Sequence, residues 1–164
     1  SIAAIQLLKL KGARIIATAS NDTKLAKAKT LGVEQIVNYS TDDFATAVSK
    51  ITNKQGLAAI IDHTGHTLWE QNIRCLKKGG SLVFCGASSG YQALTDLRYV
   101  FFKQLRILGS TMGAVGSMWQ ITDLFEHGLL KAHVDRIFPL EEAQNAHAYL
   151  ESRKTFGKVV MTIS

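Results

Sequence analysis

Three short stretches hold residues that could do chemistry, and each follows directly on a run of apolar residues. They are residues 20–24 (SNDTK), 63–66 (HTGH) and 86–90 (GASSG). Hydroxyls and glycines of this kind can contact a phosphate or a planar ring, because small residues let a ligand approach the backbone closely. The stretches therefore predict a ligand site, provided that the fold brings them together.

The first stretch indicates which nucleotide would bind. In dinucleotide-binding α/β domains, a carboxylate at the end of the corresponding strand accepts a hydrogen bond from the ribose 2′-hydroxyl and so selects NAD. Ala19 ends the run instead, followed by the hydroxyl of Ser20 and a cation at Lys24, and these groups suit a 2′-phosphate, which a fixed carboxylate would repel. An ordinary helix N-cap at Asn21 or Asp22 with a surface lysine is the alternative interpretation.

The histidines of the second stretch raise the question of a metal or of acid–base catalysis. His63 and His66 could ligate a metal together with Cys85, but their spacing matches no strong zinc pattern. A general acid–base role for His63 would need a partner carboxylate, which the sequence does not assign. We therefore expect a loop beside a ligand and name no metal ligand and no catalytic residue in this chain.

The third stretch has the G-x-S-x-G spacing of a nucleophile elbow. That elbow requires a helix to follow immediately, whereas residues 91–95 intervene here and no triad partners are evident. Acyl hydrolysis is therefore not expected. A plain flexible turn is the alternative to a ligand-binding loop.

Five apolar runs, which start 22 to 24 residues apart, must position these stretches. They cover residues 13–19, 35–38, 58–62, 81–85 and 105–109. Helical patterns that end at glycines lie between them, and this alternation implies βαβ units with a parallel sheet. The runs are apolar on both faces, so we expect fully buried strands. The predicted fold is α/β with a Rossmann-like, doubly wound parallel sheet, whose ligands bind beyond the carboxyl ends of the strands.

Residues 2–10 are apolar nearly all round and predict a buried helix with no strand before it. Because a βαβ domain does not begin on its most buried helix, we expect further chain before Ser1. In the strand order 3-2-1-4-5-6, the first run seen here would be strand 2. The strand expected to be missing is therefore the first and central one.

The pattern changes after residue 109. One more amphipathic helix ends at Gly128, and a strand over 133–138, a helix over 141–152 and a strand over 158–163 follow. We therefore expect a nucleotide-binding domain over residues 1–132 and a separate segment over 133–164. A class I methyltransferase is disfavoured, because it would close its sheet with an antiparallel hairpin.

Composition excludes several classes of protein. The chain has 164 residues, 46% of them hydrophobic, and no apolar stretch of the ~18–20 residues that a membrane span needs. The net charge is +6, but the lysines are scattered and not interleaved with aromatics, so we expect no nucleic acid partner. Cys75 and Cys85 lie in apolar patterns and predict buried free thiols in a reducing compartment, the cytoplasm.

Six phrases lie along the chain in a recognisable order: AAIQLLKLKGARIIATAS, LAKAKTLGVEQIVNYSTDDF, DHTGHTLWE, LKKGGSLVFCGASSG, FFKQLRILGSTMG and FPLEEAQNAHAYLESRKTFGKVV. Together they resemble the medium-chain dehydrogenase/reductase family, in the branch of quinone oxidoreductases and zinc-type alcohol dehydrogenases. The resemblance implies hydride transfer between NAD(P)H and a small-molecule carbonyl, alcohol, quinone or enone.

The resemblance also implies which residues contact the cofactor. Ser20, Lys24 and Tyr39 resemble the 2′-phosphate-binding set of NADPH-dependent members, and Arg153 matches a further phosphate contact, so NADP is expected ahead of NAD. Thr64 and Gly65 resemble the turn beside the adenine and ribose. Two runs resemble the segments that line the nicotinamide: Gly86, Ala87, Ser88 and Ser89, and Gly109, Ser110, Thr111 and Met112.

Other parts of the family pattern would lie outside this chain. The glycine-rich pyrophosphate loop would come directly before Ser1. The catalytic domain would carry any zinc ligands, and residues 133–164 would be its C-terminal return. Zinc is therefore possible only through that domain, and this fragment alone is expected to be inactive.

The resemblance finally implies an assembly and leaves a second function open. Members of the family join edge strands into dimers, so we expect a homodimer through residues 105–109, which the apolar Phe101 and Phe102 precede. A non-catalytic dinucleotide-binding module or sensor that retained the fold is the alternative to a reductase.

Overall fold

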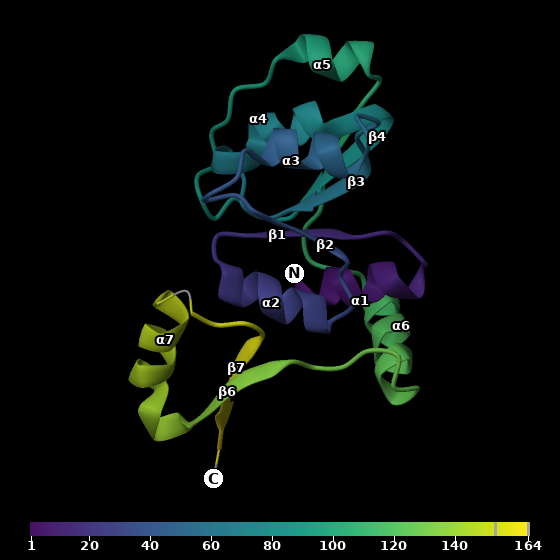
Figure 1. Ribbon diagram of the computed structural model, residues 1–164. Helices are drawn as coiled ribbons and strands as arrows, with labels where there is room; N and C mark the ends of the chain where they lie inside the picture. Colours follow the sequence, from purple (N-terminus) through teal and green to yellow (C-terminus); the bar gives the residue numbers. More distant parts are fainter. Residues whose placement is uncertain (153, 164) are drawn as a thin grey trace. The chain divides into compact units, whose positions relative to one another are not determined.

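The computed structural model describes residues 1–152 and 154–163, in which helices and strands alternate (Figure 1). The strands are β1 (Ile16–Ala19), β2 (Gln35–Asn38), β3 (Leu57–Asp62), β4 (Leu76–Phe84), β5 (Arg106–Gly109), β6 (Val134–Pro139) and β7 (Lys158–Thr162). The helices are α1 (Ile2–Leu10), α2 (Asp22–Thr30), α3 (Phe44–Ile51), α4 (His66–Cys75), α5 (Leu97–Phe102), α6 (Val115–Glu126) and α7 (Ala143–Glu151), with the 3₁₀ helix η1 (Leu140–Glu142) before α7.

The chain divides into two compact units. Unit 1 comprises Ser1–Ala17, Asp22–Ile36 and Val115–Ser164, and unit 2 comprises Thr18–Asn21 and Val37–Ala114. The predicted boundary between residues 132 and 133 stays a prediction.

A parallel three-stranded sheet with the order β3-β4-β5 is the framework of unit 2. Ile73 of α4 packs with Leu76 and Leu82 of β4 to form its buried core. Helix α4 contacts β4, and α3 lies beside α4 (Figure 1). The expected α/β fold with parallel strands is therefore confirmed.

The remaining strands form two pairs, β1 with β2 and β6 with β7, the second of them parallel. The groups β1-β2 and β3-β4-β5 correspond to strands 2–3 and 4–6 of the order 3-2-1-4-5-6. Among the described residues, no strand pairs with both β1 and β3.

Two expectations about burial are wrong. Helix α1 fully buries only Ile5, which packs against Ala28 and Val33, and its other apolar residues are partly or fully exposed. The strands are not fully buried either: Ile61 of β3 and Leu108 of β5 are 45% and 48% exposed. Successive side chains point to opposite faces of a sheet, and the core around Ile73 covers one face only.

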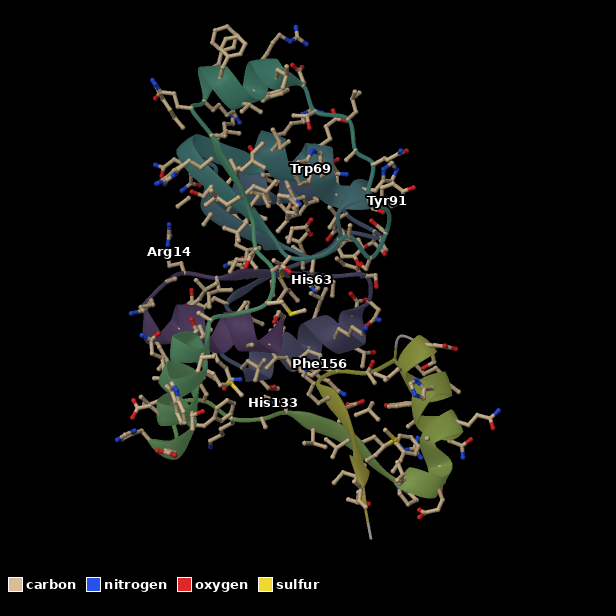
Figure 2. The ribbon with its side chains drawn as sticks, turned by 180° about the vertical axis from the view of Figure 1, so that it is seen from behind. Arg14, His63, Trp69, Tyr91, His133 and Phe156 are labelled. Carbon is tan, nitrogen blue, oxygen red and sulfur yellow. The ribbon has the colours of Figure 1, made fainter. Side chains whose placement is uncertain are left out.

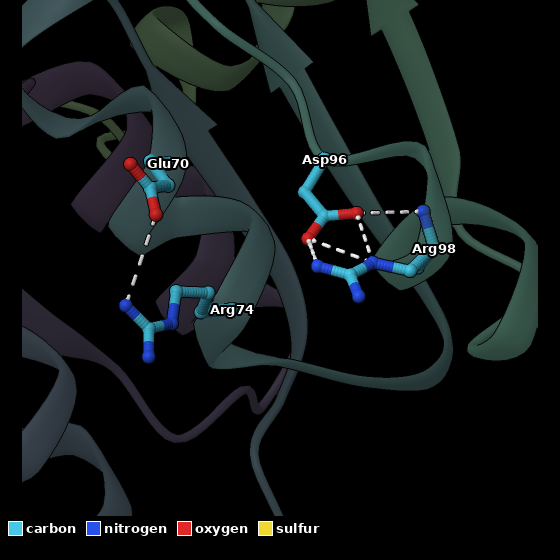
Figure 3. A network of polar contacts seen from close by, with 4 residues as sticks. All are labelled: Glu70, Arg74, Asp96 and Arg98. Atoms are coloured by element: carbon cyan, nitrogen blue, oxygen red, sulfur yellow. Dashed lines mark hydrogen bonds and ion pairs between the residues drawn. The ribbon is translucent and has the colours of Figure 1, made fainter.

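Helix α5 was not expected from the sequence. Its N-cap is Asp96, whose carboxylate accepts hydrogen bonds from the backbone N–H of Arg98 at 3.0 Å and from its guanidinium at 2.8 Å (Figure 3). An Asp directly before an apolar run is the usual signal for such a helix start. The second ion pair in Figure 3, Glu70 with Arg74, is exposed on α4 and contributes little to stability.

The two cysteines differ in their surroundings. Both are free thiols, but Cys75 is buried whereas Cys85 is exposed, so the expectation of two buried thiols is wrong for Cys85. Cys85 follows the last residue of β4, where the strand leaves the core. Within residues 1–152 and 154–163, none of the helices has both the length and the apolar character needed to cross a membrane.

In unit 1, the carboxylate of Asp135 joins α2 to the C-terminal segment. Tyr149 of α7 donates a hydrogen bond to it at 2.8 Å, and the ammonium of Lys27 on α2 lies 3.4 Å away. Lys27 also lies 5.4 Å from the ring centroid of Phe156, which Figure 2 labels. The Asp135 side chain is only 9% exposed, so these contacts compensate for its desolvation.

We expect Asp135→Asn in the complete protein to lower the free energy of unfolding at about pH 7 by about 1–2 kcal/mol. The Tyr149 hydroxyl holds the pKa of Asp135 below its ordinary value. The stabilisation by the carboxylate is therefore complete above the unfolded-state pKa of about 3.9 and is lost as the pH falls further. Thermal melts at about pH 7 and about pH 3 measure this, with Glu126→Gln, an exposed carboxylate on α6, as control. An effect of equal size at both pH values would contradict this origin.

Candidate functional site

The loops after β3, β4 and β5 leave the sheet at one edge. Asp62 is level with Phe84, and Phe84 with Gly109, so the three parallel strands end together. The backbone N–H of Cys85 donates to the carbonyl of Asp62 at 3.0 Å, and that of Ser110 donates to the carbonyl of Phe84 at 2.9 Å. This edge, called the site edge below, therefore brings together the predicted segments 64–65, 86–89 and 109–112.

Asp62 shapes the turn after β3, residues 63–66, which we call the β3 turn. The residue is 5% exposed, and its two carboxylate oxygens accept the backbone N–H groups of Thr64 at 3.0 Å and Gly65 at 2.9 Å. Because an unpaired buried carboxylate is costly, these bonds hold the turn in one conformation. Asn38 does the same after β2, where its side-chain oxygen accepts the N–H of Ser40 at 3.1 Å.

The loop after β4, residues 85–90, is fastened to the β3 turn and is called the β4 loop. The backbone N–H groups of Ser88 and Ser89 donate to the carbonyls of His63 and Thr64 at 3.2 and 2.8 Å. Their hydroxyls donate to the same two carbonyls at 3.1 and 2.7 Å. Both predicted serines therefore join the two loops, and their contact with a cofactor stays a prediction.

Small, exposed residues at the site edge leave its backbone accessible. Gly86, Ala87 and Gly109 are exposed, and so are the following Ser110 and Thr111. Met112, with φ of +51°, is 98% exposed. A planar ring could lie against this backbone, as we expect for the segments 86–89 and 109–112.

The four residues expected around a 2′-phosphate do not all belong to the same part of the described chain. Ser20 is exposed directly after β1, and Tyr39 is partly buried after β2, where its N–H donates to the carbonyl of Ala19 at 3.1 Å. Both belong to unit 2. Lys24 lies on the first turn of α2, in unit 1. Arg153 lies outside the described residues.

The pKa values of His63 and Cys75, both near the sheet, are shifted. Desolvation lowers the pKa of the His63 imidazole, a residue that Figure 2 labels. Burial raises the pKa of the Cys75 thiol to about 11, so this thiol is a poor nucleophile. In the part of the chain that the structure describes, no three His, Cys, Asp or Glu side chains are grouped so that they could hold a metal ion.

Asp62 and Asn38, which shape the loops, were not predicted from the sequence to do so. The signal was present, because Asp and Asn at a turn accept hydrogen bonds from backbone N–H groups two residues further on. Both residues end a strand and are followed by small or hydroxyl residues.

Gly65→Ala should destabilise the complete protein by about 2 kcal/mol more than Gly79→Ala. Both glycines have positive φ, +80° and +72°, so the two variants share the backbone cost. Only at Gly65 would the added methyl carbon lie 2.8 Å from the carbonyl oxygen of Gly90, whereas Gly79 has open space. Denaturant unfolding of both variants measures the difference. Equal destabilisation would contradict the close packing of the β3 turn on the β4 loop.

Comparison with known proteins shows the family to which this chain is similar. Residues 1–127 match the family model described as "Zinc-binding dehydrogenase". The chain is 30% identical to quinone oxidoreductase 1 of Escherichia coli (strain K12), over 96% of this chain and 52% of that protein. A solved NAD-dependent alcohol dehydrogenase is 43% identical with a TM-score of 0.93, over 100% of this chain and 48% of its own.

A third relative was solved with nucleotide bound. The 2-octenoyl-CoA carboxylase reductase, in complex with NADP and 2-octenoyl-CoA, is 28% identical with a TM-score of 0.87, over 97% of this chain and 40% of that one. The chain spans about half the length of the curated relatives that it matches. Together the matched residues, the fold and the register of the site edge show that this chain belongs to the zinc-binding dehydrogenases of the medium-chain dehydrogenase/reductase family.

Proposed function

We propose that the complete protein is an NAD(P)H-dependent oxidoreductase and that this chain binds the nucleotide. The observation that carries the proposal is the site edge, where three parallel strands end together and their loops carry small, exposed residues. Open α/β sheets bind nucleotides beyond the carboxyl ends of their strands. The relatives named above are a quinone oxidoreductase, an alcohol dehydrogenase and an enoyl-CoA carboxylase reductase, which supports a carbonyl, alcohol, quinone or enone as substrate.

The residues at the site edge fit a nicotinamide nucleotide. Gly86, Ala87 and Gly109 leave room for a flat ring, because a methyl group at Gly86 or Gly109 would meet no atom closer than 3.7 Å. The β3 turn is held by Asp62, and its Thr64 and Gly65 would lie beside the adenine and ribose. These residues would bind and orient the nucleotide without taking part in bond changes.

Within this arrangement the chain's own residues have a limited chemical task. A bound nicotinamide supplies or accepts a hydride at its C4 carbon. The loops fix the orientation of the ring, and the small residues bring the backbone close enough to keep water from one of its faces. The described residues offer no group of three metal ligands, so we assign them no part in holding a zinc ion.

We propose NADP as the preferred nucleotide, with NAD as the alternative. Ala19 occupies the strand end where a carboxylate would select NAD. The hydroxyls of Ser20 and Tyr39 and the Lys24 ammonium could donate to a phosphate. One relative was solved with NADP, whereas another is NAD-dependent.

The experiment that tests the function is nicotinamide oxidation by the complete protein, followed by absorbance. NADPH and NADH are each offered with a quinone, an aldehyde and an enone. Oxidation with one of these acceptors supports the proposal. Tight NADPH binding without turnover would contradict catalysis and favour a sensor, and the absence of binding would contradict both.

Ser20→Asp should reverse the preference for the nucleotide. A new carboxylate near a 2′-phosphate costs about 1–3 kcal/mol, so we expect the KM for NADPH to rise about tenfold to a hundredfold. The KM for NADH should change little or fall, because the carboxylate can accept from the 2′-hydroxyl. Steady-state kinetics with both nucleotides measure this, and Ser117→Asp, at an exposed serine of α6, controls for the added charge. An unchanged NADPH-to-NADH ratio would contradict the placement of Ser20.

We also propose that the complete protein forms a homodimer through β5. In the described chain, β5 pairs with β4 and is the last strand of its sheet. Leu108 of β5 is exposed, and so are Phe101 and Phe102 of α5, the helix that precedes it. Pairing of two such edges would satisfy their backbone groups and cover these apolar side chains. Analytical ultracentrifugation at micromolar concentration should give a dimer, and a monomer would contradict the proposal.

We place the protein in the cytoplasm as a further proposal. The free thiols of Cys75 and Cys85 support a reducing compartment. Fractionation of cells that express the complete protein would test this, and recovery from a secreted fraction would contradict it.

A further inference from the structure

One hydroxyl of the β4 loop bonds to both the β3 turn and the first turn of α4. Ser89 donates its hydroxyl proton to the carbonyl of Thr64 at 2.7 Å, and its oxygen accepts the backbone N–H of Thr67 at 3.0 Å. The serine is exposed, so it is not held there by packing in the core. The same oxygen therefore contacts both the β3 turn and α4.

The start of α4 explains why an outside partner is needed. The N-cap residue is Gly65, which has no side chain to accept an N–H of the first turn. Ser89 accepts the N–H of Thr67 instead, and the carbonyl of Gly90 accepts that of His66 at 3.2 Å. The β4 loop thus supplies the cap that most helices carry in their own sequence.

Gly65 cannot be exchanged for a capping residue without loss of this contact. A side-chain carbon there would lie 2.8 Å from the carbonyl oxygen of Gly90 and 2.9 Å from the α-carbon of Ala87. The missing side-chain cap of α4 and the close approach of the β4 loop therefore both follow from the absence of a side chain at Gly65. Ser89, which lies on the β4 loop, compensates for the missing cap by accepting the N–H of Thr67.

The contact continues along the chain after the β4 loop. The Nδ1 atom of His66 lies 2.5 Å from the carbonyl oxygen of Gln92, and the indole N–H of Trp69 donates to the hydroxyl of Thr95 at 2.8 Å. Figure 2 labels Trp69 and Tyr91 on this part of the molecule. The segment 86–95 is therefore held against α4 at several points, and Ser89 is the point nearest to the site edge.

We infer that Ser89 is a positioning residue: its hydroxyl fixes the β4 loop, and with it the backbone of Gly86 and Ala87 against which the nicotinamide lies. The inference rests on the proposed function. On this inference Ser89 does not contact the ring but orients it indirectly, by holding the β4 loop in place. Loss of the hydroxyl should therefore slow hydride transfer more than it weakens nucleotide binding, because most of the nucleotide is bound elsewhere.

The test uses the complete protein and the variants Ser89→Ala, Ser89→Thr and Ser117→Ala. Kd for NADPH is measured by fluorescence titration, and hydride transfer is measured in single turnovers with the acceptor that the wild type uses. We expect Ser89→Ala to slow transfer about tenfold or more, with Kd changed by less than about threefold. Ser89→Thr keeps the hydroxyl and should restore the rate. Ser117→Ala is the same substitution at an exposed serine of α6 and should behave as wild type.

The outcomes separate this inference from the function on which it rests. An active wild type whose Ser89→Ala variant transfers hydride at the wild-type rate overturns the inference alone. A variant that loses rate and is not restored by Ser89→Thr overturns it as well. If Ser89→Ala does not fold, Ser89→Cys, whose thiol is a weaker donor and acceptor, takes its place with the same criteria. A wild type that neither binds nor oxidises NADPH or NADH overturns the proposed function, and the inference with it.

Discussion

The buried carboxylate of Asp62 is the constraint on which the arrangement of the site edge depends. It is 5% exposed at the end of β3, and a charge removed from water in this way requires hydrogen-bond partners. The partners are the backbone N–H groups of Thr64 and Gly65, which can reach the carboxylate only if the chain turns sharply after the strand. The conformation of the β3 turn follows from the need to satisfy this carboxylate. The conformation of the β3 turn also sets the residue at which α4 begins.

The β4 loop adapts to this turn. With Gly65 at φ +80° and no side chain, the backbone of Gly90 approaches closely enough to accept the N–H of His66. The parallel register sets the level at which the two loops leave the sheet, because Asp62 and Phe84 are paired. Register, buried carboxylate and glycine therefore act together, and a change in one of them would displace the loops that we expect to line the nicotinamide.

The sequence predicted the alternation of helices and strands well, because apolar runs that recur at a regular spacing, with helical patterns between them, are typical of a parallel α/β sheet. Strand β2 was predicted to the residue, and β1 and β3 to within three residues. Burial was predicted poorly. An apolar run such as residues 2–10 indicates that a helix packs against other apolar groups. It does not indicate which part of the chain supplies those groups.

The candidate site was predicted in part for a related reason. The stretches after each strand were found, because ligand loops occur there in every open α/β sheet. The functions of individual hydroxyls were not found. Ser88 and Ser89 suggest ligand contacts by their type, yet their hydroxyls donate to backbone carbonyls of a turn more than 20 residues earlier. Such pairings depend on the register of β3 and β4, which a single sequence does not specify.

The capping of α4 also limits how this chain can bind a phosphate. A helix N-terminus binds anions when its first N–H groups point at the ligand. In α4 the N–H groups of His66 and Thr67 are already bonded to Gly90 and to Ser89. A pyrophosphate placed there would have to displace both bonds and release the β4 loop, which would remove the surface proposed for the nicotinamide. A pyrophosphate bound by the complete protein would therefore be held by groups other than the N-terminus of α4, which is better suited to hold the loop than the ligand.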